Sequence, residues 1–184
     1  LDRQYGHLTN YIFRGQKTDI WDGGHRIPLI MRWPGVIKAG STCDRTICLS
    51  DLFQTVCDVA GARVPEQVGE DSFALQPLWQ GQSFSRPPVV HHSAMGQFAI
   101  RNEQWKLVTC AGSGGWTMPA DMVPDGSPPM QLYDMQADVR ETMNLYEQRH
   151  DVVEQLQSQL QAIQGACDVE PVRCEALPQF LNRC

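Results

Sequence analysis

The sequence predicts an α/β fold followed by a smaller α+β unit, and three observations support this prediction. The apolar run Ile27–Trp33 precedes a segment with helical periodicity, which is the pattern of a strand packed against a helix. Four short β-prone runs come after Pro88. The amphipathic segment 151–165 then indicates a helix near the end of the chain.

The first strand and helix are predicted from the residues that begin and end them. Residues 1–26 are polar and glycine-rich, which is typical of a loop. Ile27–Trp33 is closed by a Pro-Gly pair, as expected for a buried strand that ends in a turn. Ser50 and Asp51 can cap a helix that ends before Gly61. Its apolar residues are Leu52, Phe53, Val56, Val59 and Ala60.

The second unit is predicted to be an antiparallel sheet of about four strands covered by one helix. Its β-prone runs are Val89–His92, Phe98–Arg101, Trp105–Cys110 and Met130–Met135. The short link Asn102–Gln104 is typical of a hairpin, whereas Gly112–Pro129 is a long Gly/Pro-rich loop of the size usually reserved for function or disorder. Asp151 can cap the last helix, and Gly165 can end it. Its apolar face would hold Val152, Val153, Leu156, Leu160 and Ile163.

These elements divide the chain into three parts. Residues 1–80 hold the α/β elements, residues 81–165 the small sheet and its helix, and residues 166–184 a cysteine-rich tail. The seven cysteines include no C-x-x-C pair, and those of the tail have no nearby histidine, which argues against a zinc site. Disulfides in an exported protein and a fully reduced set of thiols both remain open.

The composition excludes several classes of protein. The 184 residues are 42% hydrophobic and 20% charged, as in a globular chain. The net charge of −6 argues against a general nucleic-acid binder, because neutralising phosphates requires clustered Lys and Arg. The longest dense apolar stretch, Ile27–Met31, is short and contains Pro28, so no transmembrane helix is predicted. Leu1–Phe13 lacks the pattern of a signal peptide.

Most familiar catalytic motifs are absent. Gly15–Thr18 lacks the spacing of a phosphate-binding loop. Ser113 is not in a nucleophile elbow, because Ala111 occupies the position of the first glycine. His91 and His92 are adjacent in a predicted strand and would point to opposite faces, so at most one can serve a given pocket. A packed or solvated histidine is the simpler interpretation of each.

The segment Phe13–Pro28 does stand out. The simpler interpretation is an exposed glycine-rich turn that leads into a strand. This does not explain why a lone lysine, a tryptophan, a Gly-Gly pair and an arginine occur together there. Loops at the ends of strands are the places where α/β proteins build their sites, so the segment is a candidate site.

This segment resembles the sulfatase family, whose members carry R-G-x-K-x-x-x-[WY]-[ED]-G-G-x-R-x-P followed by a strand and W-P-G. Further similarity lies in Ser50–Thr55, where Gln54 replaces the usual proline, and in Asp138–Leu145. The resemblance covers roughly residues 12–165 and is nearest to arylsulfatases of the arylsulfatase A type. The positions of the first motif are filled by Arg14, Gly15, Lys17, Trp21, Asp22, Gly23, Gly24, Arg26, Pro28, Trp33, Pro34 and Gly35.

The resemblance implies the C-terminal end of an alkaline-phosphatase-like α/β catalytic domain plus a small C-terminal domain. It also implies hydrolysis of sulfate monoesters by a formylglycine nucleophile with calcium. None of the seven cysteines stands in the family's C/S-x-P/A-x-R motif, and Asp2 is a poor substitute for the family's calcium-binding Asp-Asn pair. We therefore expect the nucleophile and the calcium ligands upstream of this chain, no metal bound by the chain alone, and no activity of the chain alone.

Lys17 is the one active-site residue that the resemblance carries over, because its family counterpart contacts the sulfate group. The first strand of the small domain would begin near the site of the large domain. We therefore also expect one of His91 and His92 to face the substrate entrance.

The resemblance further implies that the partner of this chain is the remainder of a sulfatase polypeptide. The substrate would be a sulfated small molecule or glycan, and the location would be exported, that is periplasmic, extracellular or lysosomal. Two alternatives stay open. One is a phosphodiesterase or phosphonate hydrolase of the same superfamily, and the other is a non-catalytic binding module or pseudoenzyme.

Overall fold

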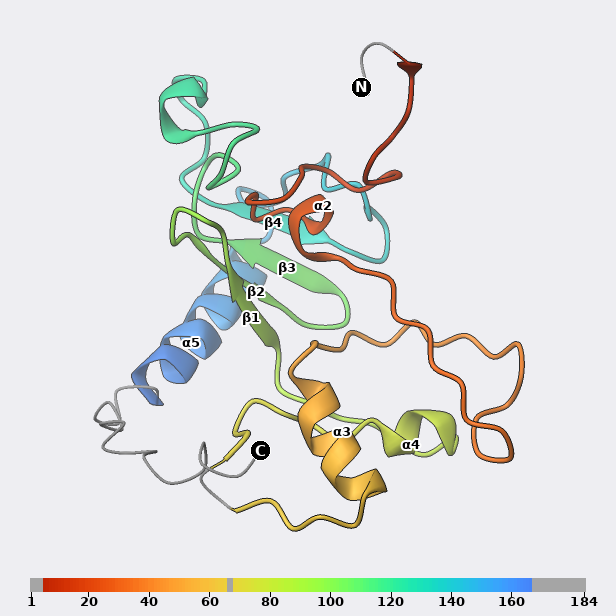
Figure 1. Ribbon diagram of the computed structural model, residues 1–184. Helices are drawn as coiled ribbons and strands as arrows, with labels where there is room; N and C mark the ends of the chain where they lie inside the picture. Colours follow the sequence, from red (N-terminus) through yellow and green to blue (C-terminus); the bar gives the residue numbers. More distant parts are fainter. Residues whose placement is uncertain (1–4, 66–67, 167–184) are drawn as a thin grey trace, which may run out of the picture.

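A computed structural model describes residues 5–65 and 68–166 of the chain. Its helices are α2 (Asp22–His25), α3 (Asp51–Val59), α4 (Gln76–Trp79), the 3-10 helix η1 (Ala120–Met122) and α5 (His150–Ala166). Its strands are β1 (Val89–His92), β2 (Phe98–Arg101), β3 (Trp105–Val108) and β4 (Gln131–Asp134). Figure 1 shows α5 on one side of the sheet, with α3 and α4 in a separate group beyond the end of the strands.

The four strands form one antiparallel sheet in the order β1-β2-β3-β4. The register places Ile100 opposite Leu107, and Leu107 opposite Leu132. The β2–β3 link is a tight hairpin in which the Asn102 side-chain oxygen accepts hydrogen bonds from the backbone N–H groups of Gln104 and Trp105, at 2.9 and 2.7 Å. The predicted antiparallel sheet and its hairpin are confirmed.

One face of the sheet packs against α5. Successive residues of a strand point to opposite faces, so Ile100, Leu107 and Leu132 lie together on this side. They meet the apolar face of α5, which is formed by Val152, Val153, Leu156 and Leu160. The predicted C-terminal helix is therefore confirmed. It includes His150 and Ala166, so Gly165 lies inside the helix instead of ending it.

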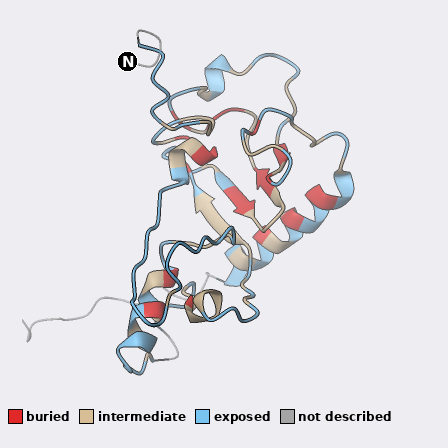
Figure 2. Cartoon of the chain, turned by 90° about the vertical axis from the view of Figure 1, so that its right-hand side faces the viewer, coloured by how far each residue is buried: buried red, intermediate tan, exposed pale blue. Residues whose placement is uncertain are grey.

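The opposite face of the sheet is covered by the segment before and within α2. Ile20 and Trp21 are fully buried there against Ala99, Val108 and Tyr133. In Figure 2 the buried residues are concentrated in the sheet, in α5 and in the chain that crosses this second face. The sheet is thus the middle layer of a three-layer arrangement. Part of the predicted loop 1–26 is its third layer, and the predicted division of the chain near residue 80 stays a prediction.

The prediction of a buried strand over Ile27–Trp33 is wrong for this structure. The segment has no strand assignment, and Ile30 is 92% exposed. A β-strand requires a neighbour to receive its hydrogen bonds. The sheet of the described residues consists of β1 to β4 alone, so no strand there pairs with this segment.

Helix α3 forms where the sequence predicts it, and Gly61 follows it with a φ of +65°. Ser50 stands at the N-cap position but makes no capping bond, while Asp51 accepts a hydrogen bond from the backbone of Cys48. The helix buries its polar residues Asp51 and Thr55, whereas Val56 is 62% exposed. Much of its apolar face is therefore uncovered in the described part of the chain.

No helix within residues 5–65 and 68–166 combines the length and the apolar character needed to cross a membrane. The cysteine-rich tail of the sequence analysis lies outside the described residues, apart from residue 166 at the end of α5. The four cysteines within the described ranges, Cys43, Cys48, Cys57 and Cys110, are free thiols.

Candidate functional site

The segment 14–25 folds back on itself so tightly that glycine is required at two positions. The backbone N–H of Gly23 donates to the carbonyl oxygen of Arg14 at 2.7 Å. A Cβ atom on Gly23 would overlap that oxygen, and a Cβ atom on Gly24 would overlap the carbonyl oxygen of Asp19. The Gly-Gly pair of the sequence motif thus has a structural cause, namely close approach of two backbone segments.

Arg14 and Trp21 fasten this segment to the sheet. The Arg14 guanidinium lies 3.7 Å from the centre of the Trp21 ring, and its Nη1 donates to the Tyr133 hydroxyl at 3.0 Å and to the backbone oxygen of Glu141 at 2.7 Å. The indole Nε1 of Trp21 donates to the side-chain oxygen of the buried Gln131 at 3.0 Å. Both motif residues therefore act as anchors.

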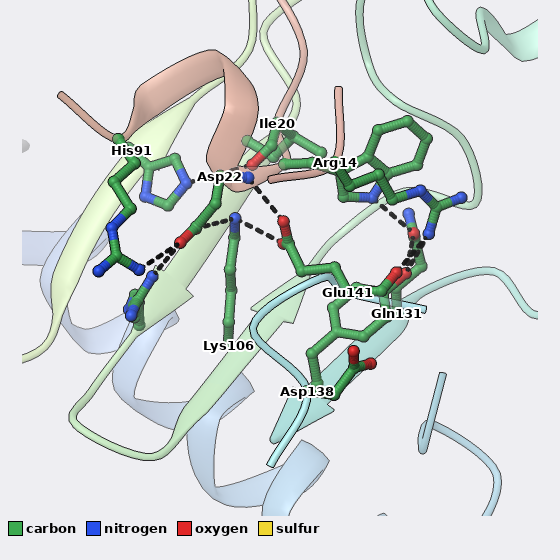
Figure 3. A network of polar contacts seen from close by, with 12 residues as sticks. Arg14, Ile20, Asp22, His91, Lys106, Gln131, Asp138 and Glu141 are labelled. Carbon is green, nitrogen blue, oxygen red and sulfur yellow. Dashed lines mark hydrogen bonds and ion pairs between the residues drawn. The ribbon is translucent and has the colours of Figure 1, made fainter. Parts of the chain in front are cut away.

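Asp22 is the centre of a buried ion cluster, shown in Figure 3. Its carboxylate lies 2.6 Å from Arg101 and 3.0 Å from the buried Lys106, which is also 2.8 Å from Glu141. The backbone N–H of Asp22 donates to the Glu141 carboxylate at 2.6 Å. Each buried charge thus has an opposite charge beside it, which a buried ion needs in order to be tolerated.

The pKa values of the two carboxyl groups move in opposite directions. Burial alone would raise the pKa of Asp22, but the charges of Lys106 and Arg101 outweigh this and hold it well below its ordinary value. Burial raises the pKa of Glu141, and the nearby Lys106 opposes this without reversing it. Asp22 is therefore the more firmly ionised partner of the shared lysine.

Lys17 lies outside this cluster. Its side chain is exposed and forms no ion pair or hydrogen bond with any of the residues that the structure describes. The backbone around it is nevertheless fixed, since Gln16 donates its N–H to the buried Asp19 carboxylate at 2.9 Å. Thr18 has a φ of +89°, which is rare for a β-branched residue and marks a constrained position. A free ammonium group on a fixed loop is suited to binding an anion.

The long loop after β3 is bound to the same segment. The Asp19 carboxylate accepts hydrogen bonds from the backbone N–H of Thr117, at 3.1 Å, and from the Thr117 hydroxyl. Ile20 donates its N–H to the Ser113 carbonyl at 2.8 Å, and Ala94 donates its N–H to Thr18 at 3.0 Å. The β1–β2 turn and the loop 112–118 therefore meet beside Lys17.

Sequence reasoning missed Asp19 and Thr117. Asp19 occupies an unspecified position of the sulfatase pattern, and Thr117 is one polar residue in a long loop. Their contact spans 98 positions of the sequence. A single sequence contains no signal for a pairing of that kind, whereas the Gly-Gly pair and the surrounding charges were visible.

The structure places the two histidines on different sides of the sheet edge. His91 is part of the face that carries α2: its Nε2 lies 3.4 Å from the Ile20 carbonyl oxygen, and its ring centre lies 4.3 Å from that of His25. His92 is exposed and its Nδ1 lies 2.9 Å from the backbone oxygen of Ser93. The two side chains thus diverge as strand geometry requires, and substrate contact by either one stays a prediction.

The carboxylates of the described segments do not fit a metal site. In residues 5–65 and 68–166, no three His, Cys, Asp or Glu side chains are grouped so that they could hold a metal ion. Asp22 and Glu141 lie close together, but both are already paired with Lys106. Calcium bound by residues upstream of this chain stays a prediction.

The family comparison identifies the fold and the lysine loop as parts of a sulfatase C-terminal region. Residues 15–166 match the family described as N-sulphoglucosamine sulphohydrolase, C-terminal, and the chain belongs to that family. The resemblance to sulfatases seen in the sequence is thereby confirmed.

The relatives are sulfatases of several kinds. An N-acetylgalactosamine-6-O-sulfatase of Bacteroides thetaiotaomicron is 29% identical over 167 residues, which is 89% of this chain and 32% of that protein. The human steryl-sulfatase is 44% identical over 75 residues, or 41% of this chain and 13% of the enzyme. The chain thus spans about a third or less of the length of these relatives.

Solved structures show the same fold. One, described with the metabolism of multiple glycosaminoglycans by Bacteroides thetaiotaomicron, has a TM-score of 0.74 at 28% identity and covers 89% of this chain and 34% of its own. A second, a complex with a neocarrahexaose, has a TM-score of 0.68 at 20% identity and covers 85% of this chain and 32% of its own. The second likeness supports the fold alone.

The Gly-Gly pair gives a stability prediction. Gly24→Ala is expected to lower the free energy of unfolding by about 1–3 kcal/mol or more, because the added methyl group overlaps backbone rather than a flexible side chain. Gly165→Ala is the matched control: it lies in α5 with open space around it, and should raise stability by about 0.5–1 kcal/mol. Urea unfolding of the three proteins measures both changes. Equal stability of the Gly24 variant and the parent would contradict the packing of this segment.

His91 gives a pH prediction. Burial, then the charges of Lys106 and His25, lower the pKa of His91 from 6.5 to about 3. The unfolded chain takes up this proton near pH 6.5 and the folded chain does not. His91 therefore contributes stability that is fully present above pH 6.5 and is lost toward pH 3, by up to about 1.4 kcal/mol per pH unit.

The measurement is urea unfolding at several values between pH 7.5 and 5. His91→Gln should remove most of the decline, while His25, whose pKa burial also lowers, keeps a smaller part of it. His92→Gln retains His91 and should show the parent's decline. An unchanged pH dependence in His91→Gln would show that this imidazole is protonated as easily in the folded chain as in the unfolded one.

Proposed function

We propose that this chain is the C-terminal part of a sulfuric ester hydrolase and that Lys17 contacts the sulfate group of the substrate. One observation carries the proposal. Among the charged residues of the sulfatase pattern, Arg14, Asp22 and Arg26 all engage partners within the chain, and Lys17 alone has none among the described residues. The charged motif residues other than Lys17 thus hold the loop in place, and the loop exposes the positive charge of Lys17 to solvent.

The chemistry of a sulfate ester suits such a charge. Its non-bridging oxygens carry negative charge that cannot be removed by protonation at ordinary pH, so they require fixed positive groups. A lysine ammonium is a compact point charge, and a charge that is already in position stabilises the transition state without reorganisation. The fixed backbone of residues 16–19 would hold Lys17 in that position.

The resemblance supplies the remaining parts of the proposed mechanism. Formylglycine would be the nucleophile and calcium would add positive charge beside the sulfate, with both contributed by residues upstream of this chain. The role of the chain itself is to bind and orient the sulfate through Lys17. The substrate class that we propose is a sulfated saccharide, on the support of the N-acetylgalactosamine-6-O-sulfatase relative and of the neighbour described with glycosaminoglycans. We propose an exported location on the same family grounds.

The partner that we propose is the rest of a sulfatase polypeptide. Two apolar surfaces support this: the exposed run Ile27–Trp33 and the exposed face of α3 around Phe53 and Val56. Uncovered apolar surface of this extent is typical of an interface. Paired with a neighbouring strand, Ile27–Trp33 would become the strand that its sequence favours.

The chain alone is expected to be inactive. The purified 184-residue chain should give no turnover of 4-nitrophenyl sulfate above a buffer blank, with or without calcium, whereas the complete polypeptide should hydrolyse it. Turnover by the chain alone would mean that it contains its own nucleophile, and the proposal would then fail.

Lys17→Ala in the complete polypeptide is the direct test of the sulfate contact. It should lower kcat/KM for a sulfate ester roughly 10²–10³-fold, the scale for removing one positioned charge from a reacting anion. The melting temperature should stay nearly unchanged because the side chain is exposed and unpaired. Lys38→Ala, at another exposed lysine, is the control and should keep full activity. A Lys17 variant within about threefold of the parent would remove this residue from the site.

A further inference from the structure

Trp116 is a large apolar side chain held in the open beside the lysine loop. It is 67% exposed, although it lies in a loop that is tightly bonded to the rest of the chain. Its backbone N–H donates to the Thr18 hydroxyl at 3.3 Å, and the next residue, Thr117, donates two hydrogen bonds to Asp19. Thr18 and Asp19 are the residues that directly follow Lys17. The exposed indole is therefore tied to the segment that carries the candidate sulfate contact.

Two glycines make this close approach possible. Gly114 has a φ of +59°, and a Cβ atom on Gly115 would lie 2.5 Å from the Thr18 carbonyl oxygen and 2.6 Å from the Asp19 carboxylate. Any other residue at Gly115 would push the loop away. The Ser113 hydroxyl closes the turn by accepting hydrogen bonds from the backbone N–H groups of Gly115 and Met118, at 3.1 and 3.0 Å. The position of Trp116 is thus fixed by the sequence of its own turn.

A second exposed apolar side chain belongs to another segment that contacts Thr18. Met95, in the β1–β2 turn, is exposed and donates its N–H to the Gly114 carbonyl at 3.3 Å, while Ala94 donates to Thr18. Three chain segments therefore converge on Thr18. Two of these segments carry an exposed apolar side chain, Trp116 in one and Met95 in the other, and the third carries the exposed Lys17.

The chemistry of this surface matches a sugar ring. A pyranose presents one face of C–H groups, which packs on a flat aromatic ring, and its hydroxyl groups project from the edge and remain in water. A flat amphipathic indole is suited to such a ligand, because it offers a large contact area with little side-chain freedom to lose. A lysine beside it would receive the anionic substituent of the same sugar.

We propose that Trp116 is a stacking platform for a sugar ring of a sulfated saccharide whose sulfate group reaches Lys17. This inference rests on the proposed function, and it deepens it by naming the residue that selects saccharides over small aryl esters. Trp116 is a specificity residue in this proposal and takes no part in bond cleavage.

The test compares two substrates in the complete polypeptide. For a 6-O-sulfated N-acetylgalactosamine disaccharide, Trp116→Ala should raise KM roughly tenfold, the equivalent of a lost stacking contact, with kcat little changed. For 4-nitrophenyl sulfate, which has no sugar ring, both constants should stay within about twofold. Trp116→Phe keeps an aromatic face and should recover most of the saccharide affinity. Met122→Ala is the matched control, since Met122 is 65% exposed in η1 of the same loop. This variant should leave kcat and KM unchanged for both substrates.

The outcomes separate this inference from the proposed role of Lys17. Both proposals are supported if Lys17→Ala lowers kcat/KM for both substrates and Trp116→Ala lowers it for the saccharide alone. If Lys17→Ala leaves activity on both substrates unchanged while Trp116→Ala raises KM for the saccharide alone, the lysine contact is refuted and the proposed role of Trp116 is retained. Equal effects of Trp116→Ala on the two substrates, or no effect on either, would overturn the platform. So would a fall of several degrees in melting temperature with loss of both activities, because Trp116 would then be packed against another part of the polypeptide.

Discussion

The buried pairing of Asp22 with Lys106 and Arg101 is the interaction on which the rest of the structure depends. Asp22 lies at the start of α2, and its two cationic partners lie on neighbouring strands. Glu141 binds the same lysine and also the backbone of Asp22, which joins the segment after β4 to the cluster. Loss of one member would leave an uncompensated buried charge. The cluster therefore fixes where the lysine loop can lie on the sheet.

This arrangement gives a physical meaning to a motif that otherwise looks like a row of functional residues. Arg14, Trp21 and the Gly-Gly pair all hold one short segment against the sheet, through a cation–π contact, hydrogen bonds and backbone contact. The side chain that remains outside is Lys17. In this chain, most residues of the motif hold in place the segment that carries the Lys17 charge.

The small sheet and α5 could be predicted from the sequence because each is defined by local pattern. Short β-prone runs separated by turn residues predict the strands, and the 3.6-residue period of Val152, Leu156 and Leu160 predicts the buried face of α5. The same reasoning failed for Ile27–Trp33, since an apolar run becomes a strand only if another strand pairs with it. It also missed the Asp19–Thr117 contact, which joins two polar residues far apart in the sequence. Local periodicity carries no information on either.

The hydrogen bonds between Asp19 and Thr117 of the loop 112–118 limit where this region can vary in evolution. The hydrogen bonds that fasten the loop end at Met118, and most of the residues that follow, including those of η1, are exposed. Insertions, deletions and exchanges between residues 119 and 129 would therefore leave the lysine loop undisturbed. A lineage could reshape the outer half of this loop to meet new polymers while its anchored inner half stays constant.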